Sequence, residues 1–528
     1  MTPILVQTPW TGEPLGEFPA TDPNLSPAML QRARTAQGLW WQKSITERVA
    51  GLAPLTPALL GDVDAWCEVI MQATGKTRCE ALLGEIYPSV ALARYYERHA
   101  ATILRDEDVA VSPWTFPGTT ARIARRPFGV VLVIAPWNYP LQLMLAPLLT
   151  ALYAGNAVII KPAEQSLPIA ARLADLLAGL ALPDDLVQWA YGDATLAEAL
   201  IDARPDLVFF TGGLAGGRAV GKRAARHPIP VILELGGKDP MIVFADADLE
   251  RAANAALYGA FCHSGQVCVS VERLYVERAA YEPFIARLCD GVARLRSDPD
   301  GELGAMTTAR QIATVTAHYD DALAQGAKAS APLHLDGQCL RPVVLWDVHH
   351  GMRVMREETF GPLLPVMAFD DTAQVIDLAN DSDFGLNASV WSLDLAKAER
   401  VARQLETGNW MINDVIKNVG HPALPFGGVK HSGFGRYHGA EGLLSMTYAV
   451  SGMTHRGHLP REPNWFPYSY EHYQHCKGYL DFVYGAGPLW QRLRRNQKAL
   501  QAFRDYAAFD GAQRWHNFKL WLKGNRTR

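Results

Sequence analysis

Cysteine is scarce in this chain, and its distribution excludes one class of protein. Only seven of the 528 residues are cysteines, an odd number scattered from Cys67 to Cys476. Secreted domains that depend on disulfide bonds carry many cysteines at regular spacing, so such a framework is disfavoured and a reducing compartment is expected. The first residues, MTPILVQTPWTGEPLG, lack the basic segment and apolar core of a secretory signal. We therefore expect a cytoplasmic protein.

A large excess of charge is also missing. Lys and Arg number 50 against 54 Asp and Glu, which gives a net charge of −4, and the sequence has neither a basic repeat nor a zinc-finger spacing. Proteins that hold a nucleic-acid backbone generally present a strongly basic surface. Nucleic acid is therefore not an expected partner, and small or neutral ligands fit better. The hydrophobic content of 49% is that of a folded protein with enough chain for two or three cores.

Charged residues are absent altogether between Pro127 and Ile160. That run is longer than a membrane-spanning helix needs. It is broken, however, by PWNYP and by Gly155, and its pieces FGVVLVIA, LQLMLAPLLTALYAG and NAVIIK have the lengths of a strand, a helix and a second strand. The segment therefore predicts a buried strand–helix–strand unit rather than a membrane span.

The order of apolar strands and amphipathic helices predicts an α/β fold. Residues 30–105 are expected to be mostly helical. Between Phe128 and Gly237, helices alternate with five apolar strands: VVLVIA, AVIIK, LVQWAY, LVFFTG and VILELGG. Such alternation is typical of a doubly wound parallel sheet. A second α/β layer is predicted beyond a boundary near Gly236, from the segments MIVFADA, ERLYVE, VVLWDV, LPVMAF and NASVWS.

The C-terminal segment 456–528 differs in composition from the rest. It holds 13 Lys and Arg against 5 Asp and Glu, and 15 of the chain's 50 aromatic residues. PLWQRLRRNQKALQAF and RWHNFKLWLKG are predicted to be basic amphipathic helices, which would suit an anionic membrane surface. The alternative is that the aromatic side chains pack on the parent domain or on a second subunit. His472, His475 and Cys476 do not complete a metal-ligand set.

Two cysteines stand close together in FCHSGQVCVS, residues 261–270. A structural zinc site wants four ligands, usually in paired spacing, whereas Cys262, His263 and Cys268 offer three at irregular spacing. A redox pair of the CxxC type needs closer spacing. A single nucleophile remains as the functional interpretation, with the Cys268 thiol projecting from a tight backbone at Gly265 and Gln266. A buried structural cysteine is the alternative.

Two polar residues are candidates to cooperate with a thiol. Glu234 lies at the end of an apolar strand, close before Gly236 and Gly237, where a partly desolvated carboxylate would have a raised pKa and serve as a general base. The alternative is a strand-end carboxylate that faces water. Asn138 follows a buried strand in APWNYP, where its side-chain amide would donate to an oxyanion or only cap the turn.

Two further segments carry nucleotide-binding signals, each weak by itself. FFTGGLAGGRAVG, residues 209–221, is a glycine-rich strand-to-helix turn of the kind that dinucleotide sites use, or a tight packing turn. IIKPAE ends a strand with Lys161 and Glu164, which would hold ribose hydroxyls or cap the next helix.

Taken together and in this order, these segments resemble the NAD(P)-dependent aldehyde dehydrogenase superfamily over residues 30–450. The resemblance rests on eight motifs: PWNYP, AGNAVIIKPAE, FFTGG…VG, LELGGKDP, FxxxGQVC, EETFGPLLPV, NDSDFGLNASVWS and LPFGGVKHSGFGRYHGAEG. It implies an α/β fold with a doubly wound parallel-sheet cofactor domain, an α/β catalytic domain and a small bridging β element. The implied bounds are 1–112 with 131–235 for the cofactor-binding domain, 236–425 for the catalytic domain, 113–130 with 440–455 for the bridging element, and 456–528 for the tail.

The resemblance implies catalytic roles for three residues. Cys268 matches the nucleophile that attacks an aldehyde to give a thiohemiacetal, whose oxyanion the Asn138 amide and the Cys268 N–H would hold. After hydride has passed to the nicotinamide, Glu234 would activate the water that hydrolyses the thioester to a carboxylic acid. The resemblance also implies a homodimer or homotetramer, and no metal is expected.

The cofactor that the resemblance implies is NAD, with NADP left open. Lys161 and Glu164 match positions at the adenosine ribose, where a carboxylate disfavours a 2′-phosphate. Glu358 and Phe360 in EETFGP match positions that hold the nicotinamide ribose and ring. The other matching positions line the floor of the cofactor cleft or lie beside the pyrophosphate: Ile134, Pro136, Trp137, Gly212, Gly213, Gly217 and Leu235.

Several positions depart from the pattern of the family. Gly213 stands where many members carry Ser, Gly216 where an apolar side chain often packs on adenine, and His263 where Asn is usual. Leu143 and Met144 would give the substrate tunnel an apolar wall. The motifs are closest in character to the class 3 and fatty or coniferyl aldehyde dehydrogenase branch, which favours long-chain or aromatic aldehydes.

Two alternative functions follow from the same residues. A coenzyme-A-acylating relative would share Cys268 but pass the acyl group to a thiol, and such enzymes generally lack a carboxylate at the position of Glu234. A non-catalytic scaffold would have no need for the complete set of Cys268, Glu234 and Asn138.

Overall fold

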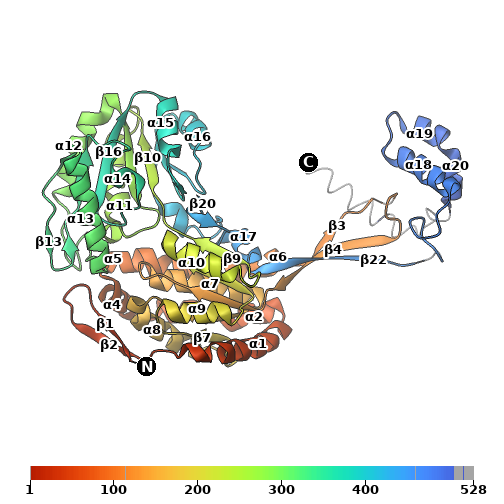
Figure 1. The fold of residues 1–528 in the computed structure, drawn as a ribbon, viewed down its shortest axis with the longest axis horizontal. Coiled ribbons are helices and arrows are strands. Elements are labelled where there is room, and N and C mark those ends of the chain that lie inside the picture. The colour runs from red at the N-terminus through yellow and green to blue at the C-terminus, as the bar shows by residue number, and fades with distance from the viewer. Residues whose placement is uncertain (1, 113, 458–459, 505–514, 516–528) are drawn as a thin grey trace. The chain divides into compact units, whose positions relative to one another are not determined.

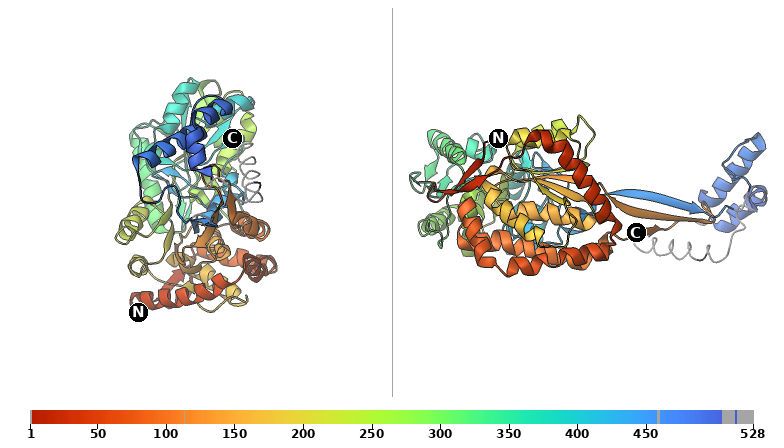
Figure 2. Two further views of the ribbon diagram at one scale, coloured as in Figure 1. Left: turned by 90° about the vertical axis from the view of Figure 1, so that its right-hand side faces the viewer. Right: turned by 90° about the horizontal axis from the view of Figure 1, so that it is seen from below.

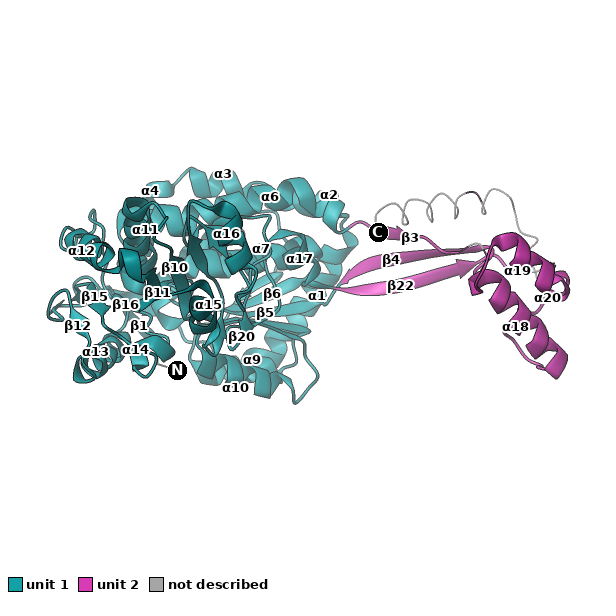
Figure 3. Ribbon diagram, turned by 90° about the horizontal axis from the view of Figure 1, so that it is seen from above, with its two compact units in different colours: residues 1–104, 127–447 teal, residues 105–126, 448–528 magenta. Residues whose placement is uncertain are grey.

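The computed structural model describes residues 2–112, 114–457, 460–504 and 515 of the chain. The chain divides into two compact units, shown in Figure 3. Unit 1 comprises Met1–Leu104 and Pro127–Thr447, and unit 2 comprises Arg105–Arg126 and Tyr448–Arg528. The chain therefore passes from one unit to the other three times, at places that lie in or near the two segments predicted to form the bridging element.

The first sheet of unit 1 has six strands in the order β21-β9-β8-β5-β6-β7. They are β5 (Val130–Ile134), β6 (Ala157–Lys161), β7 (Val187–Trp189), β8 (Leu207–Thr211), β9 (Val231–Glu234) and β21 (Gly433–Phe434). All neighbours are parallel except β21, which runs antiparallel to β9. The chain order reverses at β5, so this is the doubly wound sheet that the alternation of strands and helices predicts.

Helices cover both faces of this sheet (Figures 1 and 2). On one face, α1 (Ser26–Gln42) packs against β5 and β6 beside α9 (Ala194–Asp202), which contacts α10 (Leu214–Ala224). On the other, α7 (Pro140–Ala154) packs against the same two strands beside α8 (Leu167–Ala178). Every residue of β5, α7 and β6 is buried, because both faces of these strands are covered.

The uncharged run from Pro127 to Ile160 is thus the buried strand–helix–strand unit that its pattern predicts. Gly155 ends α7 with a φ of 98°, a conformation that glycine adopts without strain. Among the residues that the structure describes, no helix has both the length and the apolar character needed to cross a membrane.

The region predicted to be helical, residues 30–105, is confirmed. After a hairpin of β1 (Ile4–Gln7) and β2 (Pro14–Phe18), the chain forms α1, α2 (Ile45–Leu52), α3 (Leu55–Leu60), α4 (Val63–Thr74), α5 (Arg78–Ala81) and α6 (Tyr87–Ile103), with a π-helical turn, η2 (Leu82–Ile86), before α6. Trp40 of α1 is fully buried and donates from its indole nitrogen to the main-chain oxygen of Leu152 at 2.8 Å. This contact ties α1 to the end of α7.

A second sheet of seven strands follows, in the order β12-β15-β16-β11-β10-β18-β19. Its strands are β10 (Asp239–Val243), β11 (Val271–Glu277), β12 (Lys328–Ala329), β15 (Val343–Trp346), β16 (Leu363–Phe369), β18 (Ser389–Trp391) and β19 (Met411–Ile412). The helices that alternate with them are α11 (Leu249–Phe261), α12 (Tyr281–Val292), α13 (Ala309–Ala324), α15 (Thr372–Asn380) and α16 (Leu395–Ala402). The predicted second α/β layer is therefore present, and residues 235–238 link the two sheets.

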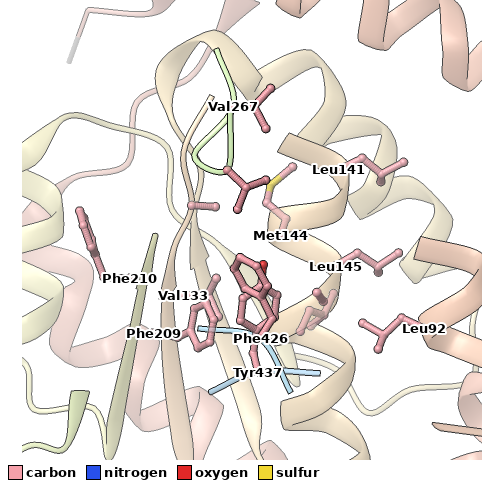
Figure 4. Close-up of a cluster of buried hydrophobic side chains, with 14 of the residues drawn as sticks. Leu92, Val133, Leu141, Met144, Leu145, Phe209, Phe210, Val267, Phe426 and Tyr437 are labelled. Carbon is pink, nitrogen blue, oxygen red and sulfur yellow. The ribbon is translucent and has the colours of Figure 1, made fainter. Parts of the chain in front are cut away.

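The C-terminal part of unit 1 returns to the first sheet. Figure 4 shows Phe426 and Tyr437 in the cluster of buried side chains that includes Val133 of β5 and Phe209 of β8, and the Phe209 and Tyr437 ring centroids are 5.8 Å apart. Gly433 pairs with Glu234, and a Cβ on this glycine would lie 1.9 Å from the oxygen of Leu233. Only a glycine allows β21 to approach β9 so closely.

Unit 2 contains a three-stranded sheet in the order β22-β4-β3, with β3 (Glu107–Val109), β4 (Thr119–Pro127) and β22 (Thr447–His455). Three helices follow: α18 (Tyr470–Tyr484), α19 (Leu489–Arg495) and α20 (Gln497–Ala502). The helix predicted over PLWQRLRRNQKALQAF is therefore divided at Asn496, and α18 was not predicted. The second predicted helix, RWHNFKLWLKG, lies outside the described residues except for Trp515.

Candidate active site

The polar and glycine residues singled out in the sequence gather at one edge of the first sheet. Ile134 ends β5, Lys161 ends β6, Gly212 follows β8 and Glu234 ends β9. These four strands are parallel, so their carboxyl ends meet at the same edge, on both sides of the point where the strand order reverses. Doubly wound folds bind their ligands at such an edge.

The Cys268 thiol lies beside this edge. A short 3-10 turn, η4 (Cys262–Gly265), leads to Cys268, which is partly accessible to solvent. A Cβ on Gly237 would meet the main-chain oxygen of Cys268 at 2.4 Å, so the turn after β9 lies directly against the cysteine. Burial, and then the charges of Asp239, Glu358 and Glu234, raise the pKa of the Cys268 thiol. The thiol must therefore lose its proton before it can attack a substrate.

Asn138 is held close to the segment that carries the thiol. It lies, buried, in the turn between β5 and α7, and its side-chain Nδ2 donates to the main-chain oxygen of Gln266 at 3.0 Å. Gln266 is two residues before Cys268. One amide hydrogen is used in this bond, which leaves the other to donate to an oxygen bound at Cys268.

Glu234 is buried without a hydrogen-bonding partner. Its side chain is 3% exposed, and among the described residues neither carboxyl oxygen has a partner. Burial raises the pKa of Glu234 well above the usual range of a glutamate, and the distant charge of Arg436 offsets this only in part. An unsatisfied buried polar group costs about 1–3 kcal/mol, so its presence calls for a functional reason. Once ionised, a carboxyl with a raised pKa is a stronger base than a solvent-exposed glutamate.

Glu358 and Phe360 approach from the second sheet. Glu358 accepts a hydrogen bond from the Gly237 N–H at 3.1 Å, and burial together with the nearby charge of Glu272 raises the pKa of Glu358 to about 8. The Phe360 ring meets the Trp137 ring edge to face, with centroids 5.6 Å apart and planes at 89°. The loop that carries Glu358 and Phe360, before β16, therefore contacts the turn that carries Trp137, after β5.

A buried ion pair that the sequence patterns did not indicate holds this loop. Lys238 Nζ lies 2.6 Å from Glu272 Oε2 and 3.0 Å from the hydroxyl oxygen of Thr359. The Glu272 carboxylate in turn accepts from the main-chain N–H groups of Thr359 at 2.7 Å and Phe360 at 2.8 Å. The available signal was a glutamate in the apolar strand VERLYVE, because a charge in a buried strand requires a partner.

The glycine-rich turn after β8 is shaped by a residue that was not predicted, Phe210. A Cβ on Gly212 would lie 2.7 Å from the Phe210 ring, and one on Gly216 2.8 Å from it. The absence of a side chain at position 216 therefore has a steric reason: the Phe210 ring occupies the space that such a side chain would need.

The remaining glycines of the turn differ in how much room they have. A Cβ on Gly217 would lie 2.4 Å from the Leu235 side chain, so these two predicted residues are in direct contact. A Cβ on Gly213, by contrast, would meet no atom within 4 Å. Gly213 is the N-cap of α10, and no side chain caps this helix. The first N–H groups of α10 are thus available to an anion.

Lys161 and Glu164 also come together, as expected. The Lys161 side chain is buried at the end of β6, with Nζ 3.6 Å from Glu164 Oε1. Burial lowers the pKa of Lys161, and the charge of Glu164 opposes this shift. Pro136 and Trp137 lie half-buried in the turn that follows Ile134, on the same edge of the sheet.

Cys262 has different neighbours from Cys268. Burial and the charge of Glu80 raise the pKa of the Cys262 thiol, whereas Lys76 and Tyr139 lower it in part. His263 is buried at a φ of 49°, with both ring nitrogens unpartnered among the described residues. All seven cysteines are free, and the described part of the chain contains no group of three or more His, Cys, Asp or Glu side chains arranged to hold a metal ion.

Known proteins similar to this chain cover almost all of it. The model of the aldehyde dehydrogenase family matches residues 2–451. A 4,4′-diapolycopene aldehyde oxidase from Methylomonas sp is 62% identical over 528 residues, which are 100% of both chains.

Two solved structures extend the comparison to the fold. An NAD-dependent aldehyde dehydrogenase from Sinorhizobium meliloti is 31% identical with a TM-score of 0.83, covering 88% of this chain and 93% of its own. The NADP-dependent glyceraldehyde-3-phosphate dehydrogenase from Bacillus halodurans C-125, complexed with NADP, is 33% identical with a TM-score of 0.82, covering 86% and 96%. The chain therefore belongs to the aldehyde dehydrogenase family and is an oxidoreductase that acts on aldehydes.

Proposed function

We propose that this chain oxidises a long, apolar aldehyde to the carboxylic acid with NAD or NADP, using Cys268 as nucleophile, Asn138 as oxyanion donor and Glu234 as base. The observation that carries the proposal is the unpartnered, buried carboxyl of Glu234 beside the Cys268 thiol. In this proposal residues 1–112 with 131–235 form the cofactor-binding domain and 236–425 the catalytic domain.

The residues at the sheet edge fit a nicotinamide dinucleotide. The uncapped N-terminus of α10 offers N–H groups to the pyrophosphate, with Gly212, Gly213 and Gly217 keeping the turn free of side chains. Lys161 and Glu164 would hold the adenosine ribose, where the carboxylate favours NAD. Glu358 and Phe360 are expected at the nicotinamide ribose and ring. The other expected cofactor-binding residues are Ile134, Pro136 and Trp137, on the floor of the cleft, and Leu235. When bound, the nicotinamide supplies the hydride acceptor.

In the first half-reaction, Cys268 would attack the aldehyde. The thiol proton passes to solvent, and the sulfur bonds to the carbonyl carbon, whose oxygen becomes an oxyanion. The free hydrogen of the Asn138 amide and the Cys268 N–H stabilise this charge, a contribution worth about 10²–10³ in rate for one such donor. Loss of hydride from the same carbon leaves a thioester on Cys268.

In the second half-reaction, Glu234 would activate water. Its carboxylate takes a proton from a water molecule while the water oxygen bonds to the thioester carbon. The carbon–sulfur bond then breaks, the acid leaves and the sulfur recovers its proton. Neither Glu234 oxygen has a hydrogen-bonding partner in the described part of the chain, which leaves both free for this transfer.

Two observations support a long, apolar substrate. The relative that is 62% identical over the full chain is described as acting on 4,4′-diapolycopene aldehyde, a long apolar aldehyde. Leu143 and Met144 of α7 are apolar and lie on the helix that follows the Asn138 turn. Both side chains are buried, and Met144 is fully so, which places it in the core of unit 1 and leaves Leu143 as the better candidate for a wall of the tunnel.

An assay with purified protein tests this proposal. We expect NADH or NADPH to form with long-chain or polyene aldehydes and much less with acetaldehyde or succinate semialdehyde. The same panel is run with coenzyme A, because an acyl-CoA product would identify the coenzyme-A-acylating alternative. It is also run with an oxygen electrode, because oxygen uptake would show that oxygen accepts the electrons instead of NAD(P). No turnover with any aldehyde under these conditions would leave the scaffold interpretation.

The two cysteines give a matched pair of variants. We expect Cys268→Ala to abolish aldehyde oxidation and Cys262→Ala to retain most of it, because only Cys268 lies beside Glu234 and Asp239. Formation of NADH with the best aldehyde of the panel measures both. Comparable losses in the two variants would refute the assignment of a single nucleophile.

Replacing the base should separate the two half-reactions. We expect Glu234→Gln to release NADH in the first turnover and then to stall as an acyl-enzyme, with a steady-state rate lower by about 10²–10⁴. Only the ionised carboxyl can take a proton, so the wild-type rate should rise with pH through the raised pKa of Glu234, and the variant should lack this rise. Stopped-flow absorbance at several pH values measures both effects. An unchanged steady state in the variant would exclude Glu234 as the base.

Unit 2 carries a surface suited to a further partner. Several of its aromatic side chains are largely exposed, among them Trp465, Phe466, Tyr470, Tyr484 and Trp490. Basic residues lie among them, with three arginines in the last turn of α19. This composition suits either a second copy of the chain, as in a homodimer or homotetramer, or peripheral contact with an anionic membrane.

Point substitutions on this surface distinguish the two partners. We expect the double variant Tyr470→Ser/Trp490→Ser to lose binding to anionic vesicles if the surface meets a membrane, and to change oligomeric mass if it meets another subunit. Co-sedimentation and light scattering measure these quantities. Leu393→Ser, an equally exposed apolar position in unit 1 (71% exposed), is the control. A double variant indistinguishable from wild type in both measurements would contradict both interfaces.

A further inference from the structure

A buried ion pair behind the Asn138 turn has no part in the chemistry described so far. Lys76 follows α4 and is fully buried, with Nζ 3.0 Å from Glu85 Oε1. The same ammonium donates to the main-chain oxygen of Asn138 and lies over the Tyr139 ring, 4.1 Å from its centroid. Two of the three groups that surround the ammonium therefore belong to the turn that carries the oxyanion donor.

Glu85 holds the same turn from its other end. Its second oxygen, Oε2, accepts from the main-chain N–H of Gln142 at 3.0 Å, in the first turn of α7. No N-cap side chain serves this helix, so the Glu85 carboxylate takes over that function and lies at the positive end of the helix dipole. The ion pair therefore binds both ends of the segment 138–142: Lys76 bonds to the main-chain oxygen of Asn138, and Glu85 accepts from the main-chain N–H of Gln142.

The segment that carries Lys76 is also bonded to the loop of the thiol. The main-chain oxygen of Thr74 accepts from the Thr307 hydroxyl at 2.6 Å, and the Thr307 N–H donates to the side-chain oxygen of Gln266 at 2.9 Å. Gln266 is the residue whose main-chain oxygen orients the Asn138 amide. The segment that carries Lys76 is therefore connected both to the Asn138 main chain, through Lys76 itself, and to the acceptor of the Asn138 side-chain amide, through Thr307 and Gln266.

The retention of two charges in this place points to a role other than stability. Taking an ammonium and a carboxylate out of water is costly, and a well-packed apolar pair of similar volume is often at least as stable. A buried ion pair with fixed hydrogen bonds does, however, define the position of the groups that it binds. Here those groups are the main-chain atoms on either side of the oxyanion donor.

We propose that Lys76, held by Glu85, is a positioning residue that fixes the Asn138 main chain so that its side-chain amide donates to the oxyanion at Cys268. The inference rests on the proposed function, because it assigns Asn138 to the oxyanion. Hydrogen-bond donors stabilise a developing charge only when they are held within a fraction of an ångström of the right place. Lys76 therefore acts through Asn138 and need not touch the substrate.

Acylation of Cys268 by p-nitrophenyl acetate tests this without cofactor or aldehyde. The sulfur bonds to the acetyl carbon, the thiol proton passes to a base, and p-nitrophenolate leaves after an oxyanion has formed. We expect Lys76→Met to slow the burst of p-nitrophenolate about 10²-fold, with little change in the ester concentration at half-saturation, and Lys76→Arg to restore part of it. In an Asn138→Ala background, Lys76→Met should cost less than about threefold more.

Alkylation by iodoacetamide is the matched control. The Cys268 sulfur bonds to the methylene carbon of the reagent, iodide leaves, the thiol proton passes to solvent, and no oxyanion forms. The rate at Cys268, followed by peptide mass spectrometry, should therefore change less than about twofold in Lys76→Met. Equal losses of alkylation and acylation, or a loss from Lys76→Met that is undiminished in the Asn138→Ala background, would show a general distortion and overturn the proposal. A wild-type Cys268 that the ester does not acylate would overturn it as well.

A second variant covers the case in which Lys76→Met does not fold. Glu85→Gln keeps an oxygen for the Gln142 N–H but removes the charge that holds Lys76, and the same non-additivity with Asn138→Ala is expected. The outcome is separable from that of the proposed function: absence of aldehyde oxidation with a Lys76-dependent ester burst would refute the reaction while leaving the positioning role intact.

Discussion

The catalytic crevice depends on one constraint, the burial of the Glu234 carboxyl in a place where none of the described residues hydrogen-bonds to it. Close backbone approaches achieve it: β21 reaches β9 through Gly433, and the Gly236–Gly237 turn lies against Glu358 and Cys268. A side chain at any of these glycines would separate the elements and open the surroundings of the carboxyl. The same burial raises the pKa values of Glu234 and of the Cys268 thiol.

Two buried lysine–glutamate pairs fix two main-chain segments that line this crevice. Lys238 and Glu272 hold the main chain at Thr359 and Phe360, and Lys76 and Glu85 hold the turn that starts at Asn138. In both pairs the carboxylate accepts from main-chain N–H groups, which fixes a backbone rather than a side chain. Such an arrangement suits a site whose donors and rings must be in place before the substrate arrives.

The sequence predicted what depends on local pattern and missed what depends on long-range contact. Buried strands at 130–134 and 157–161 follow from an uncharged run interrupted by PWNYP and Gly155, and the strand-end residues were found because parallel strands end at one edge. The return of β21 to β9 and the Lys238–Glu272 pair join segments distant in sequence, which no periodicity records. Phe210 was missed because its role depends on a contact in space: its ring occupies the positions that side chains at Gly212 and Gly216 would need.

The charge of the crevice bears on the substrate that the protein accepts. The groups whose charges raise the pKa of Cys268 are three carboxyls, and the charges of Arg436, Arg273 and Lys238 oppose them only in part. A substrate with its own carboxylate close to the aldehyde would add a further acidic group to this cluster. An aldehyde with an apolar chain adds none, and its burial is favourable in proportion to its area. The electrostatics therefore support the same preference as the apolar residues of α7 and the full-length relative.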